Sequence, residues 1–259
     1  MELIRRYLLL AIISLFPILV FITDLSAIET PLPFNPGEKM IFRVKWEFVP
    51  AGKAILEVMP FESVNGKQSF HFVFTARTNK YVDFFYKVRD RVDSYVDIKM
   101  TRSVLYKKEQ KGNSKQDIVV TFDWKNRLAH YSGPDNHQEP IIILPGTFDP
   151  LSVFFAYRLY DLNKTTKVIT PVTDGKRCVL GNAERIKKER IKVLAGEYDT
   201  YLVEPEMENI DGVFKKSKNA KLQIWVTADD RRIPVQIKSK IAVGSFVAEL
   251  VSYEEGIPE

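Results

Sequence analysis

Residues 149–160 read Asp-Pro-Leu-Ser-Val-Phe-Phe-Ala-Tyr-Arg-Leu-Tyr, a helix pattern in a chain whose other segments look like β-strands. Asp149 suits the position that caps a helix, and Pro150 suits its first turn. The apolar side chains recur at helical spacing and share one face: Leu151, Phe154, Phe155 and Leu159. We therefore predict one helix over about residues 149–161, with its apolar face buried by the rest of the chain.

The segments on both sides of this helix alternate as β-strands do. In residues 39–48 every second side chain is apolar, as expected for a sheet with one buried face: Met40, Phe42, Val44, Trp46 and Phe48. Turn signals such as Asn65-Gly66 separate further runs, which we place at 54–58, 70–77, 84–89, 91–96, 104–110, 118–124, 128–131, 167–172, 176–180, 183–193, 198–204, 222–226, 235–241 and 245–251. The sequence predicts a mainly β fold, a single antiparallel curled sheet or open barrel wrapped around one central helix.

The N-terminal segment has the features of an export signal. Arg5 and Arg6 precede an apolar run over residues 7–22, and small residues end at Ala27. We expect cleavage after Ala27, which leaves residues 28–259 as a single β-rich domain in the periplasm. Leu25, three residues before that point, fits a cleavage site poorly. The alternative is therefore a protein anchored by its N-terminus in the inner membrane.

The chain carries a formal net charge of +5, and residues 1–27 contribute two cations and two anions, so the charge of the mature chain is the same. In an exported protein this balance suits anionic lipid head groups or acidic envelope polymers better than nucleic acid. Peripheral contact with an anionic membrane is one expectation, and an ordinary solvated surface is the alternative. The cations gather in three regions, at residues 107–115, 187–192 and 215–221.

Four aromatic residues on predicted strands are candidates for a ligand-binding opening: Trp46, Phe72, Phe74 and Trp225. If they line an opening that two basic regions flank, the site would suit a ligand with an apolar body and an anionic head. Aromatic residues that alternate along strands can equally form the core, and this alternative stays open. An amphipathic small molecule or an envelope protein is the expected partner.

Ionisable residues give little sign of catalysis. Four carboxylates lie close in sequence and could serve a hydrolase: Asp83, Asp90, Asp93 and Asp97. We prefer a structural role for Asp90, as the partner of Arg158 in a buried ion pair that holds the helix to the sheet. Asp149 is expected to have a structural role as well. Ser152 lacks the glycine-flanked turn of a hydrolase nucleophile, and the three histidines lack zinc-site spacing. No metal or cofactor is expected.

Several blocks of sequence follow one another along the chain: Phe34-Asn-Pro-Gly-Glu38, Ala51-Gly52, Phe85-Tyr-Lys-Val-Arg-Asp90, Asp149-Pro-Leu-Ser152 through Arg158, Gly196-Glu-Tyr198, and Ile224-Trp225 with Asp229-Asp-Arg-Arg-Ile-Pro234. In this order they resemble the domain of unknown function family 3108, a family of uncharacterised bacterial exported proteins. The resemblance implies an envelope location and a β-rich fold. It brings no reaction and no catalytic residues.

Three functions are compatible with these features. The first is a noncatalytic cell-envelope protein that binds or chaperones an amphipathic ligand such as a lipid, glycolipid or lipidated chain. The second is an adaptor that docks on an envelope assembly machine. The third is a hydrolase that uses carboxylates of residues 83–97. A cavity would favour the first, a filled core with an exposed apolar patch the second, and converging carboxylates with raised pKa the third.

Overall fold

Strands dominate the structure, a computed structural model that describes residues 32–113, 115–134, 138–206, 221–241 and 244–257. The predicted signal peptide, residues 1–27, lies outside these ranges, as do Lys215, Lys216 and Lys218 of the third basic region. Two short helices are described, α2 (Lys80–Asp83) and α3 (Ser152–Ala156), and α3 continues as the 3₁₀-helix η1 (Tyr157–Leu159). Among the described residues no helix is long and apolar enough to cross a membrane.

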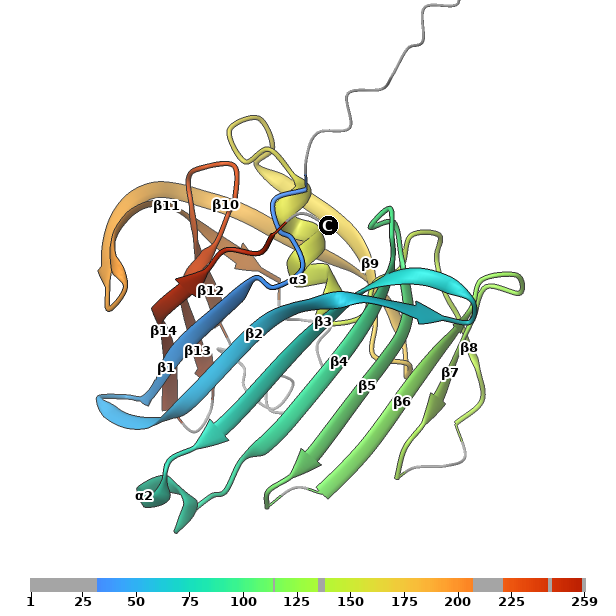
Figure 1. Cartoon of the computed structure of the whole chain (residues 1–259), viewed down its shortest axis with the longest axis horizontal. Coiled ribbons are helices and arrows are strands. Elements are labelled where there is room, and N and C mark those ends of the chain that lie inside the picture. Colours follow the sequence, from blue (N-terminus) through green and yellow to red (C-terminus); the bar gives the residue numbers. More distant parts are fainter. Residues whose placement is uncertain (1–31, 114, 135–137, 207–220, 242–243, 258–259) are drawn as a thin grey trace, which may run out of the picture. The chain divides into compact units, whose positions relative to one another are not determined.

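Fourteen strands within the described residues form one sheet, and each neighbouring pair is antiparallel. The order across the sheet is β8-β7-β6-β5-β4-β3-β2-β1-β14-β13-β12-β11-β10-β9. Two meanders therefore meet where the first strand pairs with the last (Figure 1). The strands are β1 (Lys39–Trp46), β2 (Val49–Val64), β3 (Lys67–Thr78), β4 (Arg89–Asp97), β5 (Ser103–Lys111), β6 (Lys115–Asp123), β7 (Leu128–Ser132), β8 (Ile141–Ile142), β9 (Lys167–Thr173), β10 (Cys178–Val193), β11 (Gly196–Pro205), β12 (Lys221–Thr227), β13 (Pro234–Ile241) and β14 (Gly244–Glu254).

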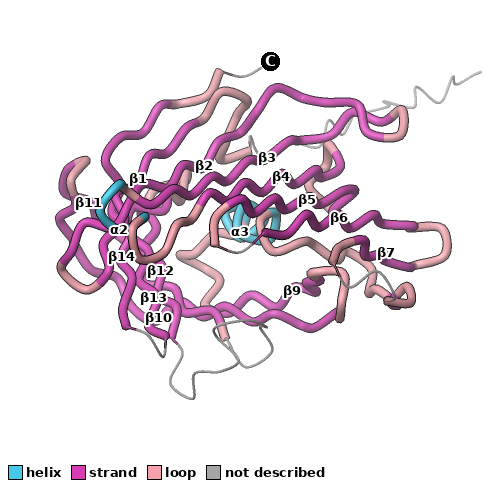
Figure 2. The backbone as a smooth tube through the Cα atoms, turned by 90° about the horizontal axis from the view of Figure 1, so that it is seen from below, coloured by secondary structure: helices cyan, strands magenta, loops and turns pink. Residues whose placement is uncertain are grey.

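The sheet curls until the chain before α3 bridges to the edge strand β9. Phe148 forms an isolated parallel bridge with Val172. Its N–H donates to the carbonyl of Pro171 at 2.9 Å, and its own carbonyl accepts from Thr173 at 2.9 Å. Figure 2 shows α3 inside the curve, between β4–β6 and β9. The predicted mainly β fold, an open curled sheet around a helix, is confirmed.

The helix is shorter than the predicted range of 149–161, because the chain tightens into a 3₁₀ turn after Ala156. Asp149 nevertheless satisfies its first turn, since Oδ1 accepts hydrogen bonds from the N–H groups of Leu151 and Ser152, both at 2.9 Å. The tighter turn changes which side chains face inward. Leu159, predicted to be buried, is exposed, and Arg158 is buried instead.

Aromatic rings fill the space between α3 and β3. Phe155 stacks on Phe72 with a centroid distance of 4.0 Å, and Phe34 packs edge-on against both rings. The predicted alternation of residues 39–48 holds only in its first half. Trp46 and Phe48 are exposed because the chain turns at the end of β1. The strand predicted over residues 84–89 is also wrong: residues 84–88 form a turn and coil after α2.

Candidate functional site

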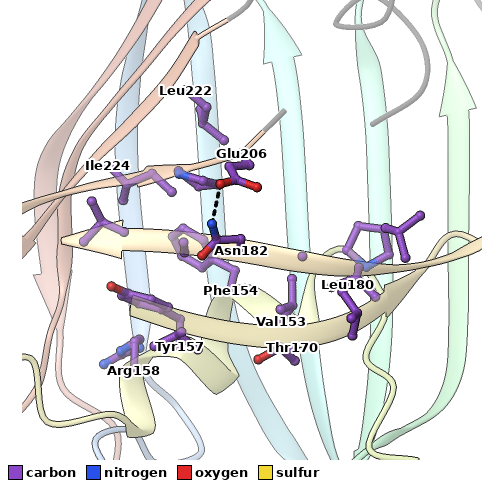
Figure 3. Close-up of a pocket in the computed structure, with 18 of the residues that line it drawn as sticks. Val153, Phe154, Tyr157, Arg158, Thr170, Leu180, Asn182, Glu206, Leu222 and Ile224 are labelled. Carbon is purple, nitrogen blue, oxygen red and sulfur yellow. Dashed lines mark hydrogen bonds between the residues drawn. The ribbon is translucent and has the colours of Figure 1, made fainter. Parts of the chain in front are cut away.

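A pocket of about 270 Å³ lies between the helical segment and the strands β9–β13. Figure 3 shows Val153, Phe154 and Tyr157 on one side of it and residues of the strands on the other. Most of its lining is apolar. The full lining is Pro150, Val153, Phe154, Tyr157, Arg158, Val168, Thr170, Val172, Thr173, Asp174, Arg177, Val179, Leu180, Gly181, Asn182, Ala183, Val203, Pro205, Glu206, Leu222, Ile224, Val226, Arg232 and Pro234.

Small and branched side chains leave this space open. On β9, Val168 and Thr170 line the pocket, while Ile169 between them is 58% exposed on the other face. On β10 a Cβ at Gly181 would lie 3.2 Å from a methyl group of Val172. A side chain at position 181 would therefore crowd Val172 and occupy space that the pocket leaves open. The pocket follows from the residue sizes on these two strands.

Two buried polar atoms at this pocket have no hydrogen-bond partner among the described residues. They are the hydroxyl oxygen of Tyr157 and Oδ1 of Asn182. Burial raises the pKa of Tyr157 to about 12, so its phenol stays protonated and can donate a hydrogen bond. Nδ2 of Asn182 donates to the carboxylate of Glu206, which leaves its Oδ1 as a free acceptor. Because unsatisfied buried polar atoms are unfavourable, a ligand that bonds to them would gain affinity.

The Arg158 guanidinium, although it borders the pocket, is held by other groups. Nη1 and Nη2 donate to the two carboxylate oxygens of Glu38 at 2.6 and 3.0 Å. Nη2 also donates to the carbonyl of Pro33 at 2.8 Å, and Nε donates to that of Arg231 at 3.0 Å. Both members of the ion pair are 1% exposed. Arg158 therefore fixes the helical segment to the chain just before β1.

The predicted ion pair between Asp90 and Arg158 is wrong. Asp90 lies at the start of β4, where it accepts a hydrogen bond from Gln110 of β5 at 2.8 Å. Glu38 precedes β1 and has both carboxylate oxygens on the guanidinium, a bidentate arrangement of the strong kind. The helix and the sheet are joined by a buried ion pair, but the acid comes from a different part of the chain.

Asp149 is the other buried charged residue that positions the helix. Its Oδ2 accepts hydrogen bonds from the hydroxyls of Ser94 on β4, Ser103 on β5 and Ser152 on α3, at 2.6, 2.6 and 2.8 Å. Asp149 and these three serines are fully buried. Ser152 thus takes part in a closed network inside the protein, away from the lining of the pocket. The arrangement ties α3 to two strands.

The structure does not bring the four predicted ligand-binding aromatic residues together. Phe72 is covered by Phe155, and Phe74 is half-buried beside the same core. Trp225 donates from Nε1 to Glu189 at 2.9 Å. Trp46 stacks on Phe246 at the end of β1, with ring centroids 6.4 Å apart. None of the four lines the pocket: Phe72 and Trp225 belong to the main core, Phe74 packs against it, and Trp46 is exposed.

The carboxylates of residues 83–97 form separate contacts. Hydrogen bonds from Arg89 and Thr78 lower the pKa of Asp83. Burial raises the pKa of Asp93, but hydrogen bonds from His71 and Arg91 outweigh it and lower the pKa to about 2. Both residues are therefore ionised near neutral pH, whereas a general acid needs a raised pKa.

Within the described ranges no cluster of three or more His, Cys, Asp or Glu residues could hold a metal ion. No sequence pattern predicted the pocket, because its lining residues are spread over five strands and the helical segment. Only Arg158, which the resemblance had singled out, was already a candidate.

Residues 41–251 match the family described as protein of unknown function DUF3108, and the chain belongs to this family. The fold is similar to that of a β-barrel-like protein of the DUF1849 family from Brucella abortus, with a TM-score of 0.58 and 8% identity over 86% of this chain and 99% of the other. Two further structures align over 86% of this chain and 98% of their own. One is a candidate exported protein with a YmcC-like fold from Bacteroides fragilis (TM-score 0.38, 7% identity), and the other is a candidate lipoprotein from Parabacteroides distasonis (TM-score 0.36, 10% identity). No curated protein matches the chain.

Proposed function

We propose that this member of the DUF3108 family is a noncatalytic cell-envelope protein that binds the apolar part of an amphipathic molecule, such as a lipid, glycolipid or lipidated chain, in the pocket beside α3. The observation that carries the proposal is the pocket itself. Half of its lining residues are Val, Leu, Ile or Pro, and two other lining residues, Tyr157 and Asn182, each carry a buried polar atom without a hydrogen-bond partner among the described residues. Ligand sites typically combine apolar walls with a few placed polar groups in this way.

The size of the pocket limits the ligand. At about 270 Å³ it is slightly smaller than the roughly 300–1,000 Å³ of common small-molecule sites. It therefore accommodates one acyl chain or one ring, not a whole two-chain lipid. The Tyr157 hydroxyl and Asn182 Oδ1 can bond to an ester, amide or hydroxyl group where the apolar part meets the head.

We assign the protein to the envelope because of its N-terminal sequence. Residues 1–27 combine arginines, an apolar run and small residues at the end, which favours export with cleavage after Ala27. Retention as an inner-membrane anchor is the alternative. N-terminal sequencing of the protein purified from its own cells distinguishes them, since cleavage predicts a first residue at position 28.

The carboxylates do not favour a hydrolase, since those with a resolved pKa shift in residues 83–97 have lowered pKa values and cation partners. An adaptor that docks on an envelope assembly machine is the alternative, and the exposed rings of Phe48, Phe84 and Phe85 are an apolar surface of the kind it would need.

Native mass spectrometry with organic extraction of the protein from its own envelope fraction tests the proposal. We expect a stoichiometric adduct with an acyl or ring component. Val153→Trp places a large side chain in the pocket and should abolish the adduct. Ile169→Trp adds the same group to the outer face of β9, where the side chain is already 58% exposed, and should keep it. Bare wild-type protein, or equal loading of both variants, contradicts the proposal.

A second variant tests the polar contact without changing the shape of the pocket. Tyr157→Phe removes only the hydroxyl. The loss of one neutral hydrogen bond is worth about 1 kcal/mol, so affinity for the extracted ligand should fall about fivefold. Thermal unfolding of each variant shows whether the fold is retained.

A further inference from the structure

Large aromatic side chains project from the end of the sheet where β1 turns into β2 and where α2 precedes β4. Phe48 is 94% exposed, Tyr81 72%, Phe84 85% and Phe85 80%. We call these four residues the aromatic tip. The β1–β2 turn and α2 lie at the same end of the strands, as Figure 1 shows. Soluble proteins rarely expose several large rings together unless a partner covers them.

Backbone contacts hold the aromatic tip in place. Asn79 caps α2 by accepting from the N–H groups of Tyr81 and Val82, and its Nδ2 donates to the carbonyl of Pro50 at 2.6 Å. At the other end of the loop, the Lys87 N–H donates to Oδ1 of Asn113 at 2.7 Å. The segment from α2 to β4 is thus bonded both to the start of β2 and to the β5–β6 turn.

Two glycines make this arrangement possible. A Cβ at Gly52 would lie 2.1 Å from the carbonyl oxygen of Arg77, and one at Gly112 would lie 1.9 Å from that of Lys87. Both distances are far below van der Waals contact, so any other residue would push the loop away. These two glycines therefore favour a fixed position for the loop that carries the exposed rings.

Cations surround the aromatic tip. Lys53, Arg77, Lys80 and Lys87 are exposed, and none makes an ion pair among the described residues. Lys53 and Arg77 are register partners one pair from the last pair of β2 and β3. Of the nearby acids, Asp83 is paired with Arg89 at 2.5 Å, and Oε1 of Glu47 accepts from the N–H of Ser245 at 2.6 Å. The unpaired charge at this end is mostly positive.

We propose that the aromatic tip inserts into the interface of an anionic phospholipid bilayer while the four cations contact its head groups. Aromatic side chains favour the boundary between water and acyl chains. Each Lys or Arg near an anionic surface adds about 1 kcal/mol of attraction. The rings protrude from turns at one end of the sheet, which suits insertion into a fluid surface. The proposal does not depend on the pocket.

Vesicle co-sedimentation tests it with the full-length gene expressed in its own host and the protein purified as the cell processes it. We expect binding to vesicles of phosphatidylcholine mixed with phosphatidylglycerol, weaker binding to phosphatidylcholine alone, and a decrease as salt is raised. The double variant Phe84→Ala and Phe85→Ala should bind about tenfold or more weakly, because two apolar rings no longer enter the bilayer. Lys80→Gln should weaken binding about fivefold, as one lost charge predicts.

Matched controls separate this effect from a general loss of exposed apolar surface. Ile142→Ala removes a side chain that is 77% exposed on β8, far along the sheet from the tip, and should leave vesicle binding unchanged. Phe84→Trp should give fluorescence that is quenched by lipids brominated in their acyl chains. No binding by the wild type, or equal binding by the double variant, overturns the proposal. So does a tip-dependent dimer or protein complex that forms without vesicles.

Discussion

Two neighbouring phenylalanines on α3 have opposite surroundings. Phe155 is fully buried and stacks on Phe72 of β3, whereas Phe154 is only partly buried and borders the pocket. Adjacent residues on a helix point about 100° apart, so one helix faces two parts of the same sheet. Toward β3 the sheet presents aromatic rings, and toward β9 it presents Val and Thr. We call the side of α3 toward β3 the filled side and the side toward β9 the hollow side. The difference between them therefore comes from the strands and not from the helix.

The charged residues that position the helix mostly reach the filled side. Asp149 binds serines of β4 and β5, and Arg158 binds Glu38 ahead of β1. On the other side Arg158 contacts the chain after β12, since its Nε donates to the carbonyl of Arg231 and its own carbonyl accepts from Nη1 of Arg232. The helix can thus be held firmly while the space toward β9 and β10 stays open. Three changes test this difference between the two sides.

The largest expected effect follows removal of Glu38. In Glu38→Ala the Arg158 guanidinium stays buried without its carboxylate, and breaking a buried ion pair in this way costs about 3–5 kcal/mol. We expect the free energy of unfolding, measured by urea titration, to fall by that amount. The pocket should be lost with it, because the helical segment loses its fixed position.

Lys39→Ala is the matched control for this variant. Lys39 is the next residue, and its ion pair with Glu57 has side chains that are 34% and 25% exposed. Exposed pairs contribute about 1 kcal/mol or less. If the two variants lost equal stability, the buried pair would not be what holds the helix.

The second prediction compares the two phenylalanines directly. Phe155→Ala leaves a void between stacked rings and should cost about 3 kcal/mol. Phe154→Ala enlarges a space that is already open, so its loss should be about 1 kcal/mol. Thermal and urea unfolding measure both. Native mass spectrometry should find the ligand retained in Phe154→Ala. Equal losses of stability would mean that both sides of α3 are packed alike.

The sequence predicted the filled side better than the hollow one. Alternation predicted that Met40 and Phe42 face a buried side, and the helix pattern predicted that Phe155 is buried, and all three are buried. Phe72, predicted as a ligand-binding residue with the core as the alternative, is in the core. These signals are local, because period and residue type are read from one segment. They failed at Trp46 and Phe48, since alternation does not reveal where a strand ends and a turn begins. The strand predicted at residues 84–88 was wrong for a similar reason, because aromatic residues that favour strands can also lie on an exposed turn.

The pocket and the ion pair depend on contacts between distant segments. Glu38 and Arg158 are 120 positions apart, and nothing near either residue identifies the other. Asp90 was chosen because its block belongs to the family resemblance, but its hydrogen-bond partner is Gln110. The pocket lining includes ordinary Val, Thr and Gly residues on β9 and β10, which become part of a site only after the sheet has curled around α3. The sequence instead favoured four aromatic residues as the ligand-binding site, because large rings at alternating positions are easily recognised: Trp46, Phe72, Phe74 and Trp225.

The smallest predicted effect is a loss of folding stability at low pH. It comes from a carboxylate on the outer surface of the filled side. Asp93 lies on β4 with Nε2 of His71 and the Arg91 guanidinium 2.8 and 2.7 Å from its carboxylate. Its pKa is about 2 in the folded protein and 3.8 without these contacts. A lowered pKa in the folded state gives stability that is present above pH 4 and is lost as pH falls toward 2. Allowing for solvent screening, we expect a loss of about 1 kcal/mol.

Asp93→Asn separates this contribution from that of the other carboxylates, which titrate in both proteins. Urea unfolding at several pH values between 4 and 2 should show the wild type losing about 1 kcal/mol more than the variant over that range. Parallel curves would mean that Asp93 is not linked to folding. Because Asp93 is remote from the lining of the pocket, ligand retention should fall only as the whole protein unfolds, and not with the titration of Asp93 itself. A ligand that left at the pKa of Asp93 from a folded protein would show that the filled side and the hollow side are coupled.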